Sequence, residues 1–303
     1  MSASRVHPCV NANTANDVVM EQLAVFSTQR SASTDLFSRN REAQTIETLR
    51  NQHAAIWSLT HAARYAELAS ILGPLIAGLE AAVNADACGD QLSEVRGMLV
   101  DAYQATSAMM AKLGATDAAW IAADRAASIA ESLGDPLALA ASLFRMAHAF
   151  LGVGAIDEVR RVAHRAIDIL EDRVKADHEP EVRSLHGALQ LVLAIAEARQ
   201  KRRAEMYRHL ERACEIANQL GEDRNDYDTE FGPTNVGIHT VAVAVELGDV
   251  DYAIQLSSEI NTNGLSPERQ ARYLIDLAAA YDARLQVDES LNCLEAAEQL
   301  TPE

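Results

Sequence analysis

The chain has few cysteines, few aromatic residues and no long apolar segment. Its four cysteines, Cys9, Cys88, Cys214 and Cys293, are scattered without the CxxC spacing of a zinc or redox site. A chain of 303 residues can bury a large core without disulfides, so we expect all four to be reduced thiols. The N-terminal stretch MSASRVHPCVNANTAND lacks the apolar core of a secretory signal, and the most apolar predicted helix, LQLVLAIAEA at 189–198, is too short to span a bilayer. These absences predict a cytoplasmic protein.

Aromatic side chains make up only 5% of the chain, whereas hydrophobic residues make up 49% and alanine is abundant. Alanine has the highest helix propensity and lets helices approach closely, whereas the strands of a β-sandwich favour branched and aromatic residues. The composition therefore excludes a typical β-sandwich and predicts a protein that is nearly all helix.

Basic residues are outnumbered, because 26 Lys and Arg oppose 44 Asp and Glu and give a formal net charge of −18. Residues 1–45 carry four charges of each sign, so the whole excess lies on residues 46–303, with 22 basic and 40 acidic side chains. Such a surface repels phosphate backbones. We therefore expect no direct nucleic-acid binding by this chain, and partners that are neutral or cationic.

A repeated pattern occupies most of the chain. A small or flexible residue is followed twelve positions later by a small or aliphatic one, with an amphipathic helix between them. The pairs are Gly114 and Ala126, Gly154 and Ala166, Lys201 and Ala213, Gly248 and Ile260, and Leu285 and Ala297. A turn that leads into a second helix packed back on the first is typical of helical-hairpin repeats. The pattern predicts an all-α, tetratricopeptide-like helical-hairpin solenoid, a right-handed superhelix whose concave groove serves binding.

The repeat starts lie 40, 47, 47 and 37 residues apart, which is looser than the period of about 34 in a strict tetratricopeptide array. Residues 46–303 form the repeat domain, with about a dozen helices. Residues 1–45, rich in Ser, Thr and Asn, are expected to be a mobile tail. Gly73-Pro74 predicts a kink in an apolar helix, with a split as the alternative. Polar residues facing outward are expected to cap the last repeat: Glu295, Glu298 and Gln299.

Residues 221–249, GEDRNDYDTEFGPTNVGIHTVAVAVELGD, differ from generic repeat sequence. This segment resembles the C-terminal sensor region of actinobacterial XRE-type helix-turn-helix transcriptional regulators, with its Gly-Glu-Asp-Arg-Asn-Asp-Tyr loop, its Phe-Gly-Pro-Thr-Asn-Val motif and a helix that contains histidine. Further stretches are similar to the same family in order, so the resemblance covers about residues 50–303. They are 61–82, 101–136, 144–159 and 265–281.

The resemblance implies an effector-sensing, tetratricopeptide-like domain that follows a DNA-reading module in the family. Such a module needs about sixty residues with a tight turn between two helices. Only about fifty weakly patterned residues precede the similar region, without a Gly-centred turn between amphipathic helices. We expect a sensor without its DNA-binding module, either naturally alone or part of a longer protein, and DNA binding is not carried over.

Polar residues on the first helix of each hairpin are the natural ligand contacts, because these helices line the concave face of a solenoid. Arg145 and His148 lie three residues apart in SLFRMAHAF and share one helix face. A cation beside a titratable ring could receive a carboxylate or carbonyl from a ligand. An ion pair of Arg145 within the protein is the alternative.

Asn235 and His239 are four residues apart in PTNVGIHTVAVAV and share a face of the helix that Pro233 begins. Thr234 and Glu230 could supply further hydrogen bonds beside them. The resemblance is most specific in this segment, which favours a ligand-binding role. The alternative is that Asn235 satisfies backbone groups of the preceding loop.

Tyr103, Trp120 and His186 lie on separate helices among Ala, Leu and Ile. We expect Trp120 in the core. Tyr103 and His186 each carry the only polar side-chain tip on their helix and are candidates for contacts in the groove. The alternative is that each is buried with its hydrogen bonds satisfied within the protein. Tyr227 is expected to anchor the EDRNDYDTE loop, whose aspartates form a solvated cluster without the spacing of an EF-hand. They are Asp223, Asp226 and Asp228.

Catalytic motifs are absent: there is no P-loop, no GxGxxG after a strand, no GxSxG and no HExxH, so we expect no cofactor and no metal. The leading hypothesis is a sensor or adaptor that binds a small molecule or short peptide and responds through curvature or dimer contacts, with a homodimer left open. The second is a protein-protein scaffold whose acidic groove takes a basic peptide. The third is an enzyme of secondary metabolism that uses His148, His186 or His239 as a general base.

Overall fold

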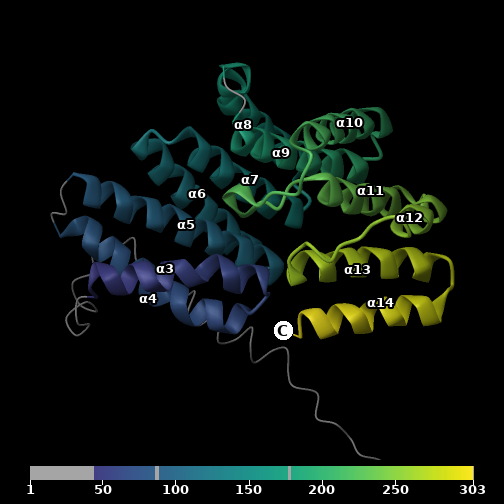
Figure 1. The fold of residues 1–303 in the computed structure, drawn as a ribbon, viewed down its shortest axis with the longest axis horizontal. Coiled ribbons are helices and arrows are strands. Elements are labelled where there is room, and N and C mark those ends of the chain that lie inside the picture. The colour runs from purple at the N-terminus through teal and green to yellow at the C-terminus, as the bar shows by residue number, and fades with distance from the viewer. Residues whose placement is uncertain (1–43, 86–88, 177–178, 303) are drawn as a thin grey trace, which may run out of the picture.

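A computed structural model describes residues 44–85, 89–176 and 179–302 (Figure 1). The predicted tail, residues 1–45, lies outside the described residues except for its last two positions, of which Thr45 caps the first described helix. The described chain forms α-helices, one 3-10 turn, and no β-structure beyond a bridge between Arg224 and Phe231. The all-α prediction is confirmed.

Twelve α-helices follow one another in the described residues. They are α3 (Ile46–His61), α4 (Tyr65–Asn84), α5 (Asp90–Lys112), α6 (Thr116–Leu133), α7 (Pro136–Gly152), α8 (Ile156–Ala176), α9 (Pro180–Arg199), α10 (Arg203–Leu220), α11 (Pro233–Leu247), α12 (Val250–Ser257), α13 (Pro267–Ala283) and α14 (Val287–Leu300), with the 3-10 turn η2 (Asp226–Asp228) before α11. Consecutive helices pair into six hairpins, from α3/α4 to α13/α14 (Figure 1).

The same turn closes all six hairpins. One residue adopts the left-handed conformation, with φ between 53° and 83°, and the next residue donates its N–H to the carbonyl five positions earlier over 2.8–3.0 Å. These left-handed residues are Ala63, Gly114, Gly154, Lys201, Gly248 and Leu285. This turn is a left-handed helix C-cap, and its hydrogen bonds satisfy carbonyls at the helix end that would otherwise be unpaired. The five predicted repeat starts are confirmed, and Ala63 adds a sixth that the sequence pattern missed.

The second helix of each hairpin buries small or aliphatic residues at fixed distances from the turn. Five positions after the turn residue, Leu68, Ala119, Val159, Met206 and Ala253 are all at most 1% exposed. The twelfth position is buried in the same way at Ala126, Ala166, Ala213 and Ala297. The exception is Ile260, because α12 ends at Ser257, so the fifth hairpin has a shortened second helix.

Helix α4 runs without interruption through Pro74, so the helix does not split there. The residue before proline is normally disfavoured in a helix because its side chain meets the proline ring, and Gly73 has no side chain. α4 is also the one described helix long and apolar enough to cross a membrane by length and composition, and it replaces 189–198 as the most apolar helix. Its residues Leu68, Leu72 and Leu75 are at most 1% exposed within the protein core. We therefore assign α4 as a core helix.

The array curves until its two ends approach each other. α13, at the far end of the chain, contacts α3 at the beginning (Figure 1). An ion pair between Lys112 of α5 and Glu268 of α13 also joins the two halves. The loop between α10 and α11, residues 221–232, crosses the inner side of this curve and contacts α7 and α3. The inner side is therefore enclosed from several directions.

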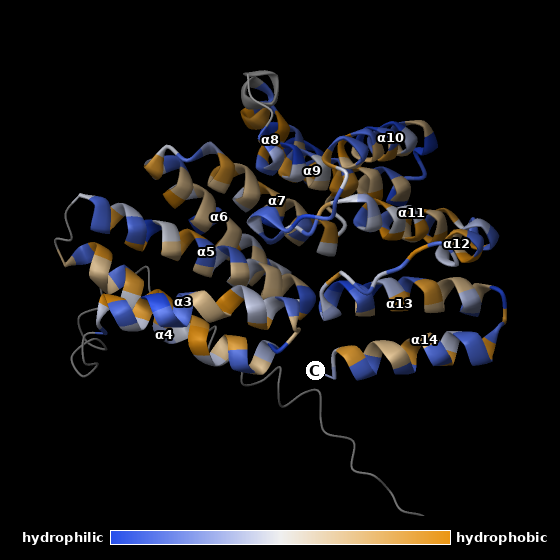
Figure 2. Cartoon of the chain, viewed as in Figure 1, coloured by the Kyte–Doolittle hydropathy of each residue, from blue (hydrophilic) through white to orange (hydrophobic). Residues whose placement is uncertain are grey.

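The last helix is only partly polar on its outer face. Glu295, Glu298 and Gln299 are exposed as predicted. Leu291 and Leu294 are also 50% and 45% exposed, and Val287 continues the same row at i, i+4 and i+7 spacing. Figure 2 shows hydrophobic and hydrophilic positions alternating along α14. The predicted polar residues therefore face outward, beside an exposed apolar row that was not predicted.

Candidate ligand-binding site

The inner side of the array holds a cavity of about 250 Å³, close to the lower end of the range of about 300–1,000 Å³ for small-molecule sites. Its lining includes residues from the first helix of every hairpin and from the loop 221–232. Helices α3, α5, α7, α9, α11 and α13 contribute, in this order, Trp57, Ser107, Phe144, Val192, Ile238 and Tyr273. The first helices therefore form the concave wall, as expected for helical hairpins.

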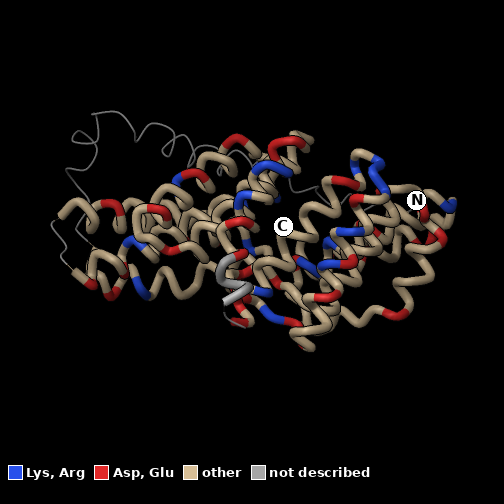
Figure 3. The backbone as a smooth tube through the Cα atoms, turned by 90° about the horizontal axis from the view of Figure 1, so that it is seen from above, with Lys and Arg blue, Asp and Glu red and all other residues tan. Residues whose placement is uncertain are grey.

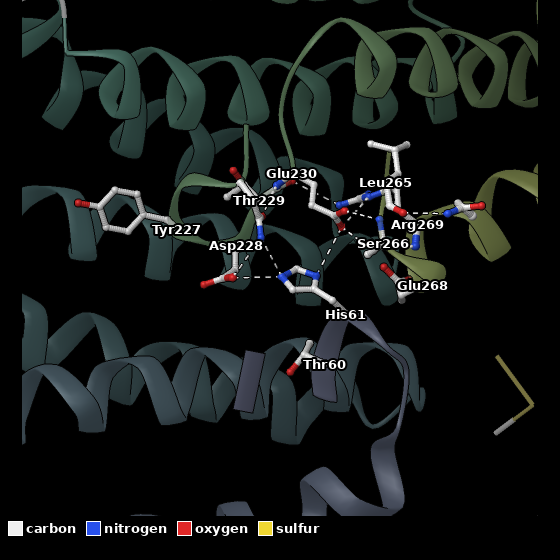
Figure 4. Close-up of polar contacts among 12 residues, drawn as sticks. Thr60, His61, Tyr227, Asp228, Thr229, Glu230, Leu265, Ser266, Glu268 and Arg269 are labelled. Carbon is white, nitrogen blue, oxygen red and sulfur yellow. Dashed lines mark hydrogen bonds and ion pairs between the residues drawn. The ribbon is translucent and has the colours of Figure 1, made fainter. Parts of the chain in front are cut away.

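His61, at the end of α3, contacts two carboxylates of the loop 221–232 (Figure 4). Its Nε2 lies 3.0 Å from Asp228 Oδ1 and its Nδ1 lies 3.5 Å from Glu230 Oε2. Burial alone would lower the pKa of His61, but hydrogen bonds to Asp228 and Glu230 outweigh it and raise the pKa to about 9. His61 is therefore a cation at neutral pH.

Glu230 continues this network to α13. Its carboxylate accepts hydrogen bonds from the backbone N–H and the hydroxyl of Ser266, both at 2.8 Å, and lies 3.7 Å from Arg269 Nε. Burial would raise the pKa of Glu230, but His61, the charge of Arg269 and the Ser266 bonds lower it to about 2. Glu230 thus links the first hairpin to the sixth through one buried carboxylate.

Arg145 projects from α7 and is 8% exposed. Its Nη2 donates to the carbonyl oxygens of Tyr227 and Asp228, at 3.0 and 2.8 Å. The guanidinium carbon lies 4.7 Å from the ring centre of Trp57 and 5.2 Å from that of Phe144, within range of cation–π attraction. Burial lowers the pKa of Arg145 to about 10, so it remains charged at neutral pH.

Two histidines in the cavity wall are neutral. Burial, together with the nearby cations Lys112 and Arg145, lowers the pKa of His148 well below its usual value. Burial and the charge of Arg269 lower the pKa of His239 to about 3. His239 Nδ1 lies 2.9 Å from the carbonyl oxygen of Asn235 and must donate to it, which leaves Nε2 as an acceptor.

The cavity lining is not acidic, although the chain as a whole is. Figure 3 shows Lys and Arg interspersed with Asp and Glu along the backbone of the described array. The lining contains Lys112, Arg145, Arg199, Arg269 and Arg272 against Asp228, Glu230, Glu268 and Asp276. His61 adds a further cation. The acidic groove of the scaffold hypothesis is therefore corrected to one with a small positive excess.

Four of the eight predicted site residues line this cavity: Arg145, His148, Glu230 and His239. Asn235, 2% exposed, lines a pocket of about 10 Å³ that shares His148 and His239 with it. Thr234 lies outside both, and its backbone N–H donates to Asp223 at 2.9 Å. The Oδ1 atom of Asn235 has no hydrogen-bond partner, so satisfying the loop backbone does not explain this side chain.

Tyr103 and His186 do not line the cavity. The hydroxyl of Tyr103 donates to Glu80 at 2.5 Å, and burial raises its pKa. His186 accepts from Gln190 at 3.0 Å on the side of α9 that faces α10. Burial lowers the pKa of His186 to about 4. Both positions fit the buried alternative, and the enzyme hypothesis loses His186 as a base in the cavity.

Two other expectations are corrected. Trp120 is 42% exposed rather than in the core. The loop aspartates are not a solvated cluster, because Asp226 pairs with Arg224 at 2.7 Å and Asp228 pairs with His61. Of the described cysteines, Cys214 and Cys293 are free thiols, whereas Cys9 and Cys88 lie outside the described residues.

Several charged residues of the cavity were not predicted from the sequence: His61, Lys112, Glu268, Arg269 and Arg272. Each lies near the end of a first helix that borders the inner curve. The available indication was the pattern SPERQAR, which places Arg269 and Arg272 three residues apart on one helix face. His61 and Lys112 have partners more than a hundred residues away in the chain, Asp228 and Glu268, and local spacing does not encode such contacts.

Comparison with solved structures supports the architecture. Neither a protein-family model nor a curated protein sequence matches the chain. Among solved structures, the apo form of RapI superposes with a TM-score of 0.61 at 10% identity, over 95% of this chain and 96% of RapI. The chain has a tetratricopeptide-like solenoid fold. BtubC from P. vanneervenii gives a TM-score of 0.48 at 16% identity over 83% of this chain and 90% of BtubC.

Proposed function

We propose that this protein is a sensor or adaptor that binds a small molecule or a short peptide in the cavity on the inner side of its array. The observation that carries the proposal is that the first helices of all six hairpins contribute to one cavity. A ligand there contacts both α3 and α13, whose approach sets the curvature of the array. Binding then shifts the array between curvatures in proportion to its differential affinity for them.

The same proposal includes a relation to actinobacterial XRE-type regulators. Its support is the resemblance of residues 221–249, which contribute Glu230 and His239 to the cavity and Asn235 to the adjoining pocket. A partner that reads the curvature would pass the signal on, since the acidic chain is not expected to bind DNA itself. We place this activity in the cytoplasm.

Native mass spectrometry of the protein purified from its own host tests the proposal. Ala108 lines the cavity with a small side chain, so Ala108→Phe should fill part of the space and displace a retained ligand. Ala279 is exposed on α13 and outside the cavity, so Ala279→Phe is the matched control. We expect a retained mass in wild type and control, and its loss in Ala108→Phe. Equal retention by both variants would contradict the site.

A further inference from the structure

Most charged side chains around the cavity have a partner of opposite charge. His61 pairs with Asp228 and Glu230, and Arg269 lies beside the same Glu230. The remaining two carboxylates are also taken. Lys112 pairs with Glu268, and Arg272 pairs with Asp276 at 3.1 Å. All four carboxylates of the lining therefore have cationic partners.

Two lining cations have no carboxylate partner: Arg199, which is exposed and donates to the Leu151 carbonyl, and Arg145. Arg145 is buried. It has no carboxylate within salt-bridge distance, because the Asp228 carboxylate is bound to His61 and only the Asp228 carbonyl reaches Arg145. Both hydrogen bonds of its Nη2 go to neutral carbonyls, and its buried Nε has no hydrogen-bond partner. A buried guanidinium without a counter-charge is costly, since burial disfavours the charged form. One buried positive charge in the cavity is thus left without a carboxylate partner.

Apolar groups surround this charge. Trp57 and Phe144 flank the guanidinium, and the wall beyond it includes Ala111, Ile195 and Ala242. A site of this kind favours a ligand with one charged end and an apolar body. The neutral ring of His239, whose Nε2 is an acceptor, can also take a hydrogen bond from a ligand hydroxyl or amide group.

We propose that the cavity binds a small organic acid with a single negative charge, whose carboxylate pairs with Arg145 and whose apolar body lies along α5, α9 and α11. This inference rests on the proposed function and specifies its ligand class. The planar guanidinium matches the two oxygens of a carboxylate. A phosphate monoester would bring nearly two negative charges, whereas Arg145 is the single buried cation of the described lining without a carboxylate partner.

The test uses straight-chain carboxylates from butanoate to decanoate, each compared with its neutral primary amide by isothermal titration calorimetry. A hydrogen bond to a charged group contributes about 1.5–3 kcal/mol, so at least one carboxylate should bind roughly 10- to 100-fold more tightly than its amide. Arg145→Gln should reduce this ratio to about 1. Arg212→Gln, which removes an exposed cation paired with Glu215 on α10, should leave the ratio unchanged.

The ratio of carboxylate to amide affinity is measured on the wild-type protein, so the test remains valid even when Arg145→Gln does not fold. Amide binding by Arg145→Gln reports that its cavity is intact. Equal affinity for acid and amide, tighter binding of octyl phosphate than of octanoate, or no binding of any carboxylate at about 10 mM would overturn the inference. A neutral molecule retained by wild type and lost from Ala108→Phe would overturn it as well, while supporting the proposed function.

Discussion

A contact between one glycine and one phenylalanine seats the loop that borders the cavity. Phe231 is fully buried, and a side chain at Gly187 of α9 would place its Cβ 2.0 Å from the Phe231 ring. The ring therefore lies directly on the backbone of α9. The residue before it is Glu230, so this contact fixes the position of the carboxylate that binds His61 and Ser266.

Gly187→Ala should destabilise the protein, although alanine is the better helix former. Overpacking against Phe231 should cost about 1–3 kcal/mol and weaken ligand binding by displacing the loop. Gly97→Ala in α5 is the control, because a Cβ there meets nothing within 4 Å, and it should stabilise by up to about 1 kcal/mol. Thermal unfolding of both variants measures this. A Gly187→Ala variant as stable as wild type would show that the loop adapts freely.

Each hairpin turn depends on the backbone conformation of a single residue. Three of the six turn residues are glycines, which adopt positive φ without strain, but Ala63, Lys201 and Leu285 hold the same conformation with a side chain. The turn is kept because its hydrogen bonds satisfy the end of the preceding helix. Identical turns explain why six hairpins of different sequence stack in the same way.

Leu285→Gly should raise stability, because Leu285 is 86% exposed and its φ of 59° is unfavourable for a side chain. The expected gain is about 0.5–1 kcal/mol, the relief of strain minus the added freedom of the unfolded chain. Gly154→Ala imposes the opposite change at φ 71° and should cost about 1 kcal/mol. Urea unfolding followed by circular dichroism compares the two, and a loss of stability in Leu285→Gly would contradict this account.

At the scale of the whole molecule, buried histidines on different hairpins control how stability changes with pH. His61 has a raised pKa of about 9, so its contribution is complete below its unfolded pKa near 6.5 and is lost as the pH rises through 9. His239 and His186 have lowered pKa values of about 3 and 4. As the pH falls below 6.5, these histidines bind protons in the unfolded chain before they do so in the folded protein, so stability declines. The opposite directions predict maximal stability near pH 6.5.

His61→Gln should therefore remove most of the decline in stability between pH 6.5 and 9, because the charge that holds the loop to α3 is gone at every pH. His239→Gln should instead reduce the decline between pH 6.5 and 4 and leave the alkaline side unchanged. Melting temperatures across pH 4–9 at constant ionic strength measure both effects. An unchanged alkaline decline in His61→Gln would show that another group dominates.

The sequence by itself determined the helices, the turns and the pairing of neighbours, because these depend on contacts within about fifty residues and on backbone preferences of single positions. It also identified Arg145 and His239, whose polar character on apolar first helices was visible locally. Only the tertiary structure brought His61 to Asp228 across 167 positions and Lys112 to Glu268 across 156. These contacts depend on the accumulated curvature of six hairpins with unequal lengths, and no local pattern records that sum. Tyr103 and His186 instead bond to Glu80 and Gln190 outside the cavity, and Trp120 is exposed.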